Sequence, residues 1–414
     1  MIKEMAEKAK KASYELARIP TDVKNRALLS MADALEENVE AILEANKRDV
    51  EASEARGVKP SLLDRLILNP NRVGKMARCL REVSELPDPV GQIVRTWTRP
   101  NGLIVGQVRV PLGVVGVIYE SRPDVTSDAS GICLKSGNAV ILRGGSDAIN
   151  SNIALGEVLS KAAGSVGVPK DAIQVVKTTD RRAAVELMQM RGYVDVLIPR
   201  GGVGLIKAVL ENAKVPVIET GAGNCHIYVD EDADPEMAIE IIINAKTQRP
   251  GTCNAADKLL VHEAIAESFL PMAVSRLWEA GVEVRGGPLT REILPDIIPA
   301  NEMDWYTEYL DLIIGVKVVE GVDEAIAHIN KYGTQHSDAI VTPSFDRALH
   351  FINDVDSAAV YWNASTRFTD GNQFGLGAEI GISTQKMHAR GPMSVDHLTT
   401  IKYFILGRGH VRES

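Results

Sequence analysis

The chain has 414 residues, of which 45% are hydrophobic, and its formal net charge is −9. This length predicts a globular protein of two or three domains, and the excess of acidic over basic residues argues against a nucleic-acid-binding surface. No apolar run reaches the roughly 18 residues of a membrane span, and the N-terminus is charged every few residues, unlike a signal peptide.

The first 87 residues predict a series of helices. Apolar residues recur at helical spacing, as at Ala27, Met31 and Leu35, with Glu and Lys on the opposite face. Pro87 and Pro89 then end the helical region.

Residues 92–110 predict a long β-hairpin. Residues 92–99 and 103–110 alternate in polarity, and Pro100-Asn101-Gly102 forms the turn between them. A two-stranded ribbon is not stable alone, so we expect it to lie on another surface, such as a second subunit. At the other end of the chain, residues 399–411 predict a late strand followed by a loose tail.

Two α/β regions lie between the hairpin and this late strand. Strands that are apolar throughout are typical of a parallel sheet covered by helices on both faces. The first region has predicted strands at 113–119, 139–145, 172–177, 194–202 and 215–219, with helices such as 150–167 and 182–190 between them. The second has predicted strands at 258–262, 282–287, 317–321, 338–342 and 358–364.

Two strands of the first region end in the same motif. Arg143-Gly144-Gly145 is followed by Ser146 and a helix, and Arg200-Gly201-Gly202 precedes another helix. A glycine turn before a helix N-terminus suits a phosphate group. There is no G-x-G-x-x-G, so the alternative is that both are ordinary strand-to-helix loops. Their repetition at the strand ends of one sheet favours a nucleotide site.

Cys253 lies on a predicted turn, in QRPGTCNA (248–255). Most single cysteines are small buried apolar residues, but backbone N–H groups at a turn can stabilise a thiolate, and Arg249 would add positive charge. No two of the four cysteines are spaced C-x-x-C, which indicates reduced thiols in a cytoplasmic protein.

Two further groups lie upstream of Cys253. Glu219 stands at a strand end, where a carboxylate serves either as a loop cap or as a general base. Cys225-His226 has no further ligands at metal spacing, so we expect no metal.

Four long segments together resemble the aldehyde dehydrogenase superfamily over the whole chain: 110–148, 215–234, 244–262 and 374–393. The resemblance implies an α/β fold with two Rossmann-like parallel-sheet domains and a β-ribbon for oligomerisation. It implies an NADP-binding domain at 1–91 and 111–225, a catalytic domain at 226–384, and a ribbon with a C-terminal strand at 92–110 and 385–414.

The resemblance also implies roles for single residues. Cys253 is similar to the catalytic thiol, and Glu219, 34 residues before it, has the spacing of the superfamily's glutamate base. The superfamily's oxyanion asparagine is replaced, with Ser121 as its nearest counterpart. The oxyanion donors are then the Cys253 N–H together with Ser121 or another donor, and Asn254 joins the expected catalytic residues.

The cofactor that the resemblance implies is NADP(H). Arg143 stands where the superfamily often has a ribose-binding lysine, and Ser146 stands where NAD-preferring members often have a glutamate. An arginine without a competing carboxylate favours a 2′-phosphate, although Arg143 could merely cap its strand. Glu308 resembles the glutamate that holds the nicotinamide ribose. The expected cofactor residues are Arg143, Gly144, Gly145, Ser146, Arg200, Gly201, Gly202, Glu219 and Glu308.

Within the superfamily the segments most resemble the branch that reduces L-glutamyl 5-phosphate to L-glutamate 5-semialdehyde in proline biosynthesis. That substrate carries a carboxylate and a phosphate, which bidentate guanidinium groups suit. The expected substrate residues are Arg122, Arg249, Asn363, Ser365 and Arg367, with ordinary ion pairing as the alternative for each arginine. The resemblance implies a homo-oligomer, a dimer or tetramer, and glutamate 5-kinase is a candidate functional partner.

Two other functions stay open from the sequence. One is a hydrolytic aldehyde dehydrogenase, for which Glu219 would activate water; in an acyl-phosphate reductase we expect Glu219 to be turned away or dispensable. The other is a non-catalytic scaffold that binds a nucleotide.

Overall fold

The computed structural model describes residues 1–58 and 60–412 and forms two compact units. Unit 1 contains Met1–Thr220, Gly375–Gly381 and the C-terminal residues from Met393, and unit 2 contains Gly221–Phe374 and Ile382–Pro392. The chain therefore passes between the units several times. Each unit is described below by itself.

Helices make up the first part of unit 1, as predicted. They are α1 (Ile2–Leu16), α2 (Thr21–Glu37), α3 (Val39–Ala55), α4 (Pro60–Leu66) and α5 (Pro70–Glu85). The start of α5 follows from its sequence: the Asn69 side chain accepts a hydrogen bond from the Arg72 backbone N–H, and Pro70 occupies the first helical position.

Unit 1 also contains a parallel four-stranded sheet in the order β5-β4-β3-β6. The strands are β3 (Val114–Tyr119), β4 (Ala139–Gly144), β5 (Ile173–Val175) and β6 (Val196–Arg200), and the helices between and after them are α6 (Asp124–Lys135), α7 (Ile149–Ser165), α8 (Arg181–Met188) and α9 (Val203–Asn212). Every residue of β3 and β4 is buried, as expected for a sheet covered on both faces. The chain order reverses at β3, so the ends of β3 and β6 form the kind of crevice in which such sheets bind ligands.

The strand predicted at 215–219 is reduced to an isolated bridge. Only Leu197 and Val217 pair, through hydrogen bonds of the Leu197 backbone with Pro216 and Ile218. Pro216 has no N–H to donate, and glycines follow at 221 and 223, so the pairing does not extend.

Unit 2 contains a seven-stranded sheet in the order β10-β9-β11-β8-β7-β12-β13, parallel throughout. Its strands are β7 (Cys225–Val229), β8 (Ala256–His262), β9 (Glu283–Gly286), β10 (Ile298–Pro299), β11 (Ile313–Val319), β12 (Ser337–Val341) and β13 (Ala359–Trp362). Strand β7 was not predicted from the sequence, although it is fully buried and lies between β8 and β12.

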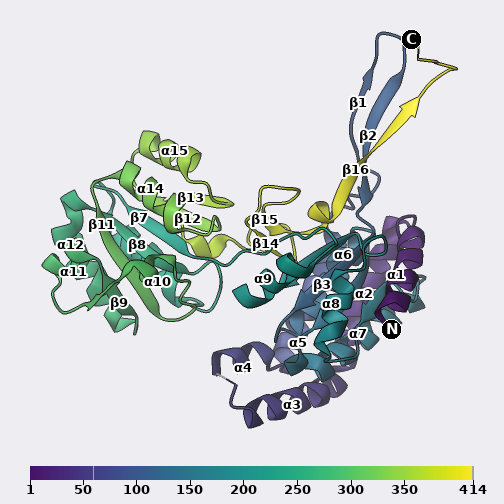
Figure 1. Cartoon of the computed structure of the whole chain (residues 1–414), viewed down its shortest axis with the longest axis horizontal. Coiled ribbons are helices and arrows are strands. Elements are labelled where there is room, and N and C mark those ends of the chain that lie inside the picture. Colours follow the sequence, from purple (N-terminus) through teal and green to yellow (C-terminus); the bar gives the residue numbers. More distant parts are fainter. Residues whose placement is uncertain (59, 413–414) are drawn as a thin grey trace. The chain divides into compact units, whose positions relative to one another are not determined.

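Helices cover both faces of this sheet (Figure 1). On one face, α10 (Pro235–Thr247) and α11 (Glu263–Glu279) contribute to the larger apolar core, and α12 (Pro288–Ile293) lies beside α11. On the other, α14 (Val322–Tyr332) and α15 (Phe345–Asp354) pack on Tyr228, Leu260 and Ile340. The short α13 (Glu302–Tyr306) precedes the segment that carries Glu308.

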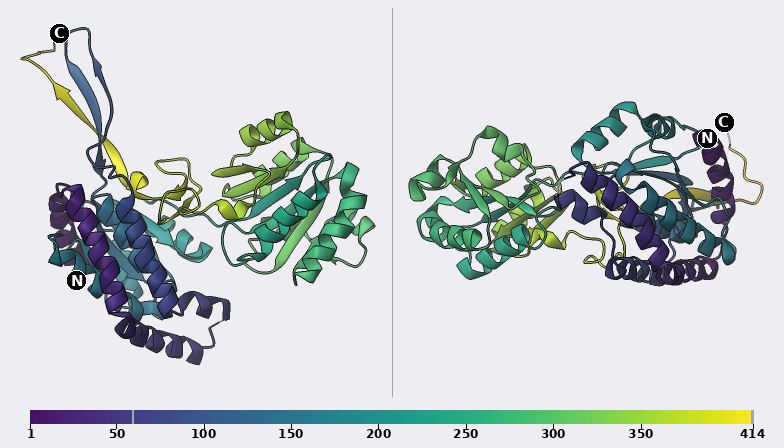
Figure 2. Two further views of the ribbon diagram at one scale, coloured as in Figure 1. Left: turned by 180° about the vertical axis from the view of Figure 1, so that it is seen from behind. Right: turned by 90° about the horizontal axis from the view of Figure 1, so that it is seen from below.

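The predicted hairpin forms, and the C-terminal strand joins it. β1 (Ile93–Thr98), β2 (Ile104–Pro111) and β16 (Thr399–Leu406) form an antiparallel three-stranded sheet in unit 1, and they run side by side in Figures 1 and 2. Gly102 occupies the turn with φ +85°, a conformation that favours glycine. β14 (Gly381–Ser383) and β15 (Gly391–Met393) form a separate two-stranded sheet.

Among the described residues, no helix combines the length and the apolar character needed to cross a membrane.

Candidate active site

Cys253 lies on the loop that connects α10 to β8. Strand β8 is the central strand of the seven-stranded sheet of unit 2. The Cys253 side chain is half-buried. The loop is tightly turned, because the Thr252 hydroxyl donates to the Arg249 carbonyl (2.8 Å) and the Ala255 N–H donates to the Thr252 carbonyl (3.0 Å). Parallel α/β sheets bind ligands beyond the carboxyl ends of their strands, whereas Cys253 approaches from the amino end of β8, so neighbouring loops must complete its surroundings.

Gly223 is the closest of these neighbours. A side chain on Gly223 would overlap the carbonyl of Cys253, so only glycine permits this approach. The Cys225 thiol donates to the same carbonyl over 3.1 Å. Cys225 is fully buried, and burial raises the pKa of its thiol well above the ordinary value, so it is not a second nucleophile.

Arginines share the electrostatic surroundings of Cys253. Burial lowers the pKa of the Arg367 guanidinium, the nearby charge of Arg249 lowers it further, and Cys253 acts in the opposite direction. Arg367 is therefore close enough to interact with both Arg249 and Cys253. Positive charge of this kind favours a thiolate over a thiol and also suits an anionic substrate.

Asn254 ties the Cys253 loop to the segment after β13. Its side-chain carbonyl contacts the Arg367 guanidinium, and its amide donates to the Thr369 carbonyl over 2.8 Å. Its backbone carbonyl accepts from the Thr366 hydroxyl over 2.7 Å. With 4% of its surface exposed, Asn254 is placed to fix the loop.

Ser365 and Arg367 belong to the same short turn, η2 (Thr366–Phe368), which Ser365 caps through a 3.3 Å bond from the Arg367 backbone N–H. The Arg367 Nε also donates to the Gln248 side chain (2.9 Å). Asn363 has a different arrangement: it lies at φ +53°, and its side-chain amide exchanges two hydrogen bonds with the backbone of Thr342.

Glu308 contacts Gly223, in the segment that precedes β7. Its Oε1 accepts a hydrogen bond from the Gly223 N–H over 2.8 Å, and Gly223 lies against the Cys253 carbonyl. The structure thus connects Glu308 to Cys253 through one intervening glycine. Leu310, two residues on, is exposed and lies at φ +53°.

The first glycine turn of unit 1 lies at the end of β4. Arg143 is 9% exposed, and its guanidinium donates to the carbonyls of Gly144, Thr179 and Asp180. Its Nε has no hydrogen-bond partner among the described residues, and burial lowers the pKa of this guanidinium. Gly145 lies against the backbone at the end of β3, and Ser146 is exposed at the start of the next turn, η1 (Ser146–Ala148).

The second glycine turn, Arg200-Gly201-Gly202, precedes α9. The Gly202 N–H donates to the Glu120 carboxylate over 2.9 Å, and a side chain on Gly201 would collide with that carboxylate. A negative group therefore already lies at the N-terminus of this ten-residue helix. The Arg200 guanidinium lies 3.9 Å from Glu379.

Ser121 and Arg122 lie in the turn between β3 and α6. Ser121 adopts φ +33°, an unusual value for a residue with a side chain, and its hydroxyl donates to Asp147 over 3.2 Å. Arg122 is half-buried. Glu219, also half-buried, follows the isolated bridge at Val217.

Comparisons with known proteins place this architecture in a family. The aldehyde dehydrogenase family profile matches residues 1–292. The γ-glutamyl phosphate reductase of Caldanaerobacter subterraneus subsp. tengcongensis is 60% identical over 408 residues, which cover 99% of each chain. The chain belongs to the γ-glutamyl phosphate reductases of the aldehyde dehydrogenase family.

Solved γ-glutamyl phosphate reductases share the fold. The crystal structure of the reductase from Thermotoga maritima has a TM-score of 0.96 at 54% identity, with both chains covered completely. The structure of the reductase from Saccharomyces cerevisiae is 32% identical, with a TM-score of 0.55, and the match covers 99% of this chain and 98% of that one. The family and the fold class predicted from the sequence are thus confirmed.

Several contacts of the candidate site residues carried no recognisable signal in the sequence. Gly223 and Cys225 were part of a matching segment, but nothing in their spacing indicated contact with Cys253. Glu120 likewise gave no sign that its carboxylate would reach the second glycine turn. His226 hydrogen-bonds Asp338 through its Nδ1 (3.1 Å), and the described residues include no group of three potential metal ligands.

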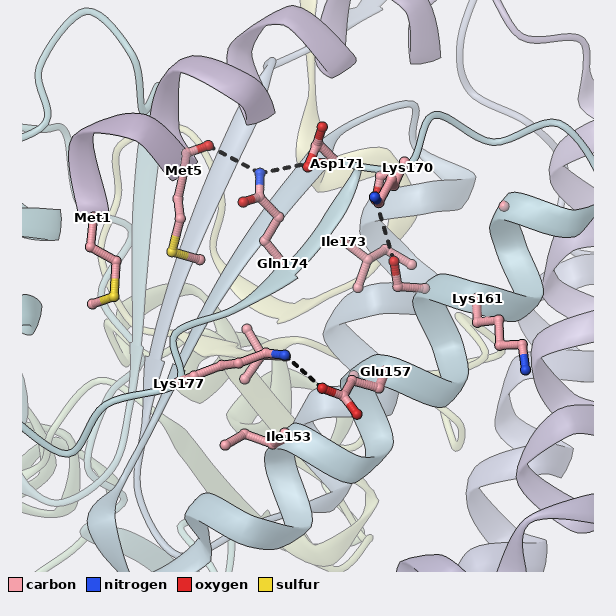
Figure 3. A pocket seen from close by; sticks show the side chains of 14 residues that line it. Met1, Met5, Ile153, Glu157, Lys161, Lys170, Asp171, Ile173, Gln174 and Lys177 are labelled. Carbon is pink, nitrogen blue, oxygen red and sulfur yellow. Dashed lines mark hydrogen bonds and ion pairs between the residues drawn. The ribbon is translucent and has the colours of Figure 1, made fainter.

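A pocket of about 760 Å³ opens elsewhere on unit 1, beside strand β5 (Figure 3). Residues of α1, α7 and β5 line it, and Lys177 pairs with Glu157 across it over 2.6 Å. None of the predicted catalytic, cofactor or substrate residues lines this pocket.

Proposed function

We propose that this chain reduces L-glutamyl 5-phosphate to L-glutamate 5-semialdehyde and phosphate with NADPH, the second step of proline biosynthesis from glutamate. The observation that carries the proposal is the position of Cys253: a half-buried thiol on a tightly turned loop, near enough to the Arg367 guanidinium for their charges to interact. Family membership over the full length supports the substrate.

In the first half of the reaction the Cys253 thiolate attacks the acyl carbon. A carbon–sulfur bond forms, the bond from that carbon to the phosphate oxygen breaks, and phosphate leaves with the electron pair. The product is a glutamyl thioester on Cys253. The Cys253 backbone N–H, with Ser121, stabilises the negative oxygen of the tetrahedral intermediate, and Arg122, Arg249 and Arg367 bind the anionic groups of the substrate.

The residues of unit 1 fit a dinucleotide. The buried Arg143 keeps one N–H without a partner among the described residues, which suits an anionic group, whereas the Glu120 carboxylate on the Gly202 N–H has to move aside before a phosphate can bind there. We assign two segments, residues 143–146 and residues 200–202, to binding the phosphates and the adenosine ribose. Glu308 is assigned to binding the nicotinamide ribose. When bound, NADPH supplies the hydride that reduces the thioester carbon; Cys253 then leaves as thiolate when the carbon–sulfur bond breaks.

Phosphate dependence separates this function from hydrolytic aldehyde oxidation. The test is oxidation of L-glutamate 5-semialdehyde with NADP⁺ in the presence and absence of phosphate. We expect turnover only with phosphate, and a Glu219→Gln variant that keeps most of it, because no water has to be activated. Turnover without phosphate would support the hydrolytic reaction instead.

The role of Cys253 has its own test. Cys253→Ser should lose at least about a thousandfold in kcat, because a hydroxyl of pKa far above 7 replaces the thiolate. Wild-type protein mixed with acyl phosphate should gain the mass of a glutamyl group on the peptide that contains Cys253. A serine variant that retains turnover would remove the mechanism, and a wild type without turnover would leave the non-catalytic scaffold.

We also propose that the chain forms a dimer or tetramer through the sheet of β1, β2 and β16. Ile401, Tyr403 and Ile405 alternate along β16 and therefore share one face, with 38%, 54% and 56% of their surfaces exposed. An exposed apolar strand face of this kind is typical of an interface. A cytoplasmic location and a functional link to glutamate 5-kinase, which would supply the unstable acyl phosphate, belong to the same proposal.

A further inference from the structure

A buried network of charged residues surrounds the segment that carries Glu308. Lys246, Asp257 and Lys258 lie in unit 2 with 2% or less of their surfaces exposed. The Lys246 ammonium donates to Asp257 over 2.8 Å. Buried charges of this kind seldom add net stability, because desolvation offsets the attraction between them. Their presence in the core of the sheet therefore calls for another explanation.

Two of these residues hold the backbone on either side of Glu308. The Lys258 ammonium donates to the Thr307 carbonyl over 2.8 Å, and the Asp257 carboxylate accepts from the Tyr309 N–H over 3.3 Å. Two neighbouring residues of β8 thus form hydrogen bonds with the backbone of the residue before Glu308 and of the residue after it. The Glu308 carboxylate is then directed to the Gly223 N–H.

The path of Lys258 to Thr307 depends on a glycine in the adjacent strand. Gly315 of β11 is directly opposite Lys258 in the sheet, and a side chain there would press on the Lys258 stem. The ammonium then lies 4.4 Å from the centre of the Tyr309 ring, a cation–π distance. Arg285 and Asp304 hold the other side of Tyr309, since its hydroxyl donates to Asp304 over 2.9 Å.

We propose that Lys258 and Asp257 are positioning residues that hold Glu308 in place for the nicotinamide ribose. This inference rests on the proposed function, because it assigns their role through Glu308. It predicts that losing either anchor weakens the cofactor interaction and leaves the chemistry of the Cys253 thiol intact. A side chain that only stabilised the fold would have no such selective effect.

The first experiment compares Lys258→Met with wild type. Methionine keeps most of the length and removes the donor. We expect the KM for NADPH to rise about tenfold or more, as Glu308 loses its fixed position, while the alkylation rate of Cys253 by iodoacetamide changes less than about twofold. Lys258→Arg should restore most of the affinity, because a guanidinium can also donate to the Thr307 carbonyl.

A matched control is available in unit 1. Lys135 is also fully buried, and its ammonium also donates to a backbone carbonyl, that of Ser84, over 2.8 Å. Lys135→Met should destabilise the protein and leave the KM for NADPH unchanged. An equal rise in KM in both variants would show that the effect is general destabilisation, and would overturn the inference.

A double-mutant cycle decides whether Lys258 acts through Glu308. In a Glu308→Gln background, Lys258→Met should add less than about a twofold further loss, because the group it positions has already been altered. Independent, multiplying losses would overturn the inference. If Lys258→Met does not fold, Asp257→Asn takes its place in the same cycle.

The outcomes also separate this inference from the proposed function. A wild type that does not reduce L-glutamyl 5-phosphate contradicts the function itself. A wild type that does so, together with a Lys258→Met variant of unchanged KM for NADPH, contradicts only the positioning role.

Discussion

At the scale of single residues, the chemistry depends on a few side chains with unusual surroundings. Cys253 is half-buried and interacts with the charge of Arg367, whereas Cys225, which donates to the Cys253 carbonyl, is fully buried and its thiol pKa is raised. The same residue type thus has different surroundings at two neighbouring positions. The predicted turn and the family resemblance both indicate Cys253 as a candidate nucleophile, but no local pattern in the sequence indicates that Cys225 is fully buried.

The preference for NADPH can be tested at Ser146, which is exposed just after the Arg143 turn. Ser146→Glu would place a carboxylate near the proposed 2′-phosphate. We expect kcat/KM for NADPH to fall about tenfold or more, with little change for NADH, because only NADPH carries the repelled charge. Ser146→Gln, of similar size and without charge, is the control. Equal losses for both cofactors would contradict the assignment of this turn.

At the scale of elements, the loops between strands of unit 2 depend on one another. Gly223, just before β7, packs against the Cys253 carbonyl, and its N–H donates a hydrogen bond to the Glu308 carboxylate. Asn254, which follows Cys253 on its loop, links that loop to the segment around the turn η2 through hydrogen bonds. Segments distant in sequence therefore meet at the Cys253 loop, and a side chain added at the closest contact, Gly223, should displace that loop.

Gly223→Ala tests this dependence. The added methyl group overlaps the Cys253 carbonyl, so the loop must move. We expect kcat to fall about a hundredfold or more because a displaced nucleophile loses its alignment, while circular dichroism stays near that of wild type. Gly164→Ala is the control: its new methyl group meets nothing within 4 Å in the described part of the chain, so it should keep full activity. An active Gly223→Ala variant would show that this contact is not needed.

At the scale of the whole molecule, buried titratable groups set the pH range of stability. His328 of α14 is 4% exposed and lies among the rings of Trp305, Tyr332 and His226. Burial lowers its pKa to about 2, with a further contribution from His226 and from Lys317, Lys258 and Lys331. The folded protein therefore keeps His328 neutral, whereas the unfolded chain binds a proton below about pH 6.5.

This difference predicts a loss of stability in acid. Below about pH 6.5 the unfolded state binds more protons than the folded state at this site. The free energy of unfolding therefore decreases as the pH is lowered, by up to about 1.4 kcal/mol per pH unit. His328→Phe keeps a ring and cannot be protonated, so its free energy of unfolding should fall less between pH 7 and 5. Urea unfolding at several pH values measures both slopes, and parallel slopes would contradict the assignment.

The sequence by itself determined much of this protein. Local patterns predicted the N-terminal helices, the hairpin, most parallel strands and the glycine turns, because apolar periodicity and turn residues act over a few positions. The family resemblance indicated Cys253 and Glu308 as candidate functional residues. Both kinds of signal lie along the chain and need no knowledge of which strands become neighbours.

Only the tertiary structure decided which residues meet. The strand predicted at 215–219 is only an isolated bridge in the structure, and strand β7 was not predicted. The Asn363 side-chain amide forms hydrogen bonds with the Thr342 backbone. The contacts of Gly223 with Cys253 and of Lys258 with Thr307 join residues far apart in sequence. The physical reason is that strand order and register place such groups together, and neither is encoded in the residues immediately around them.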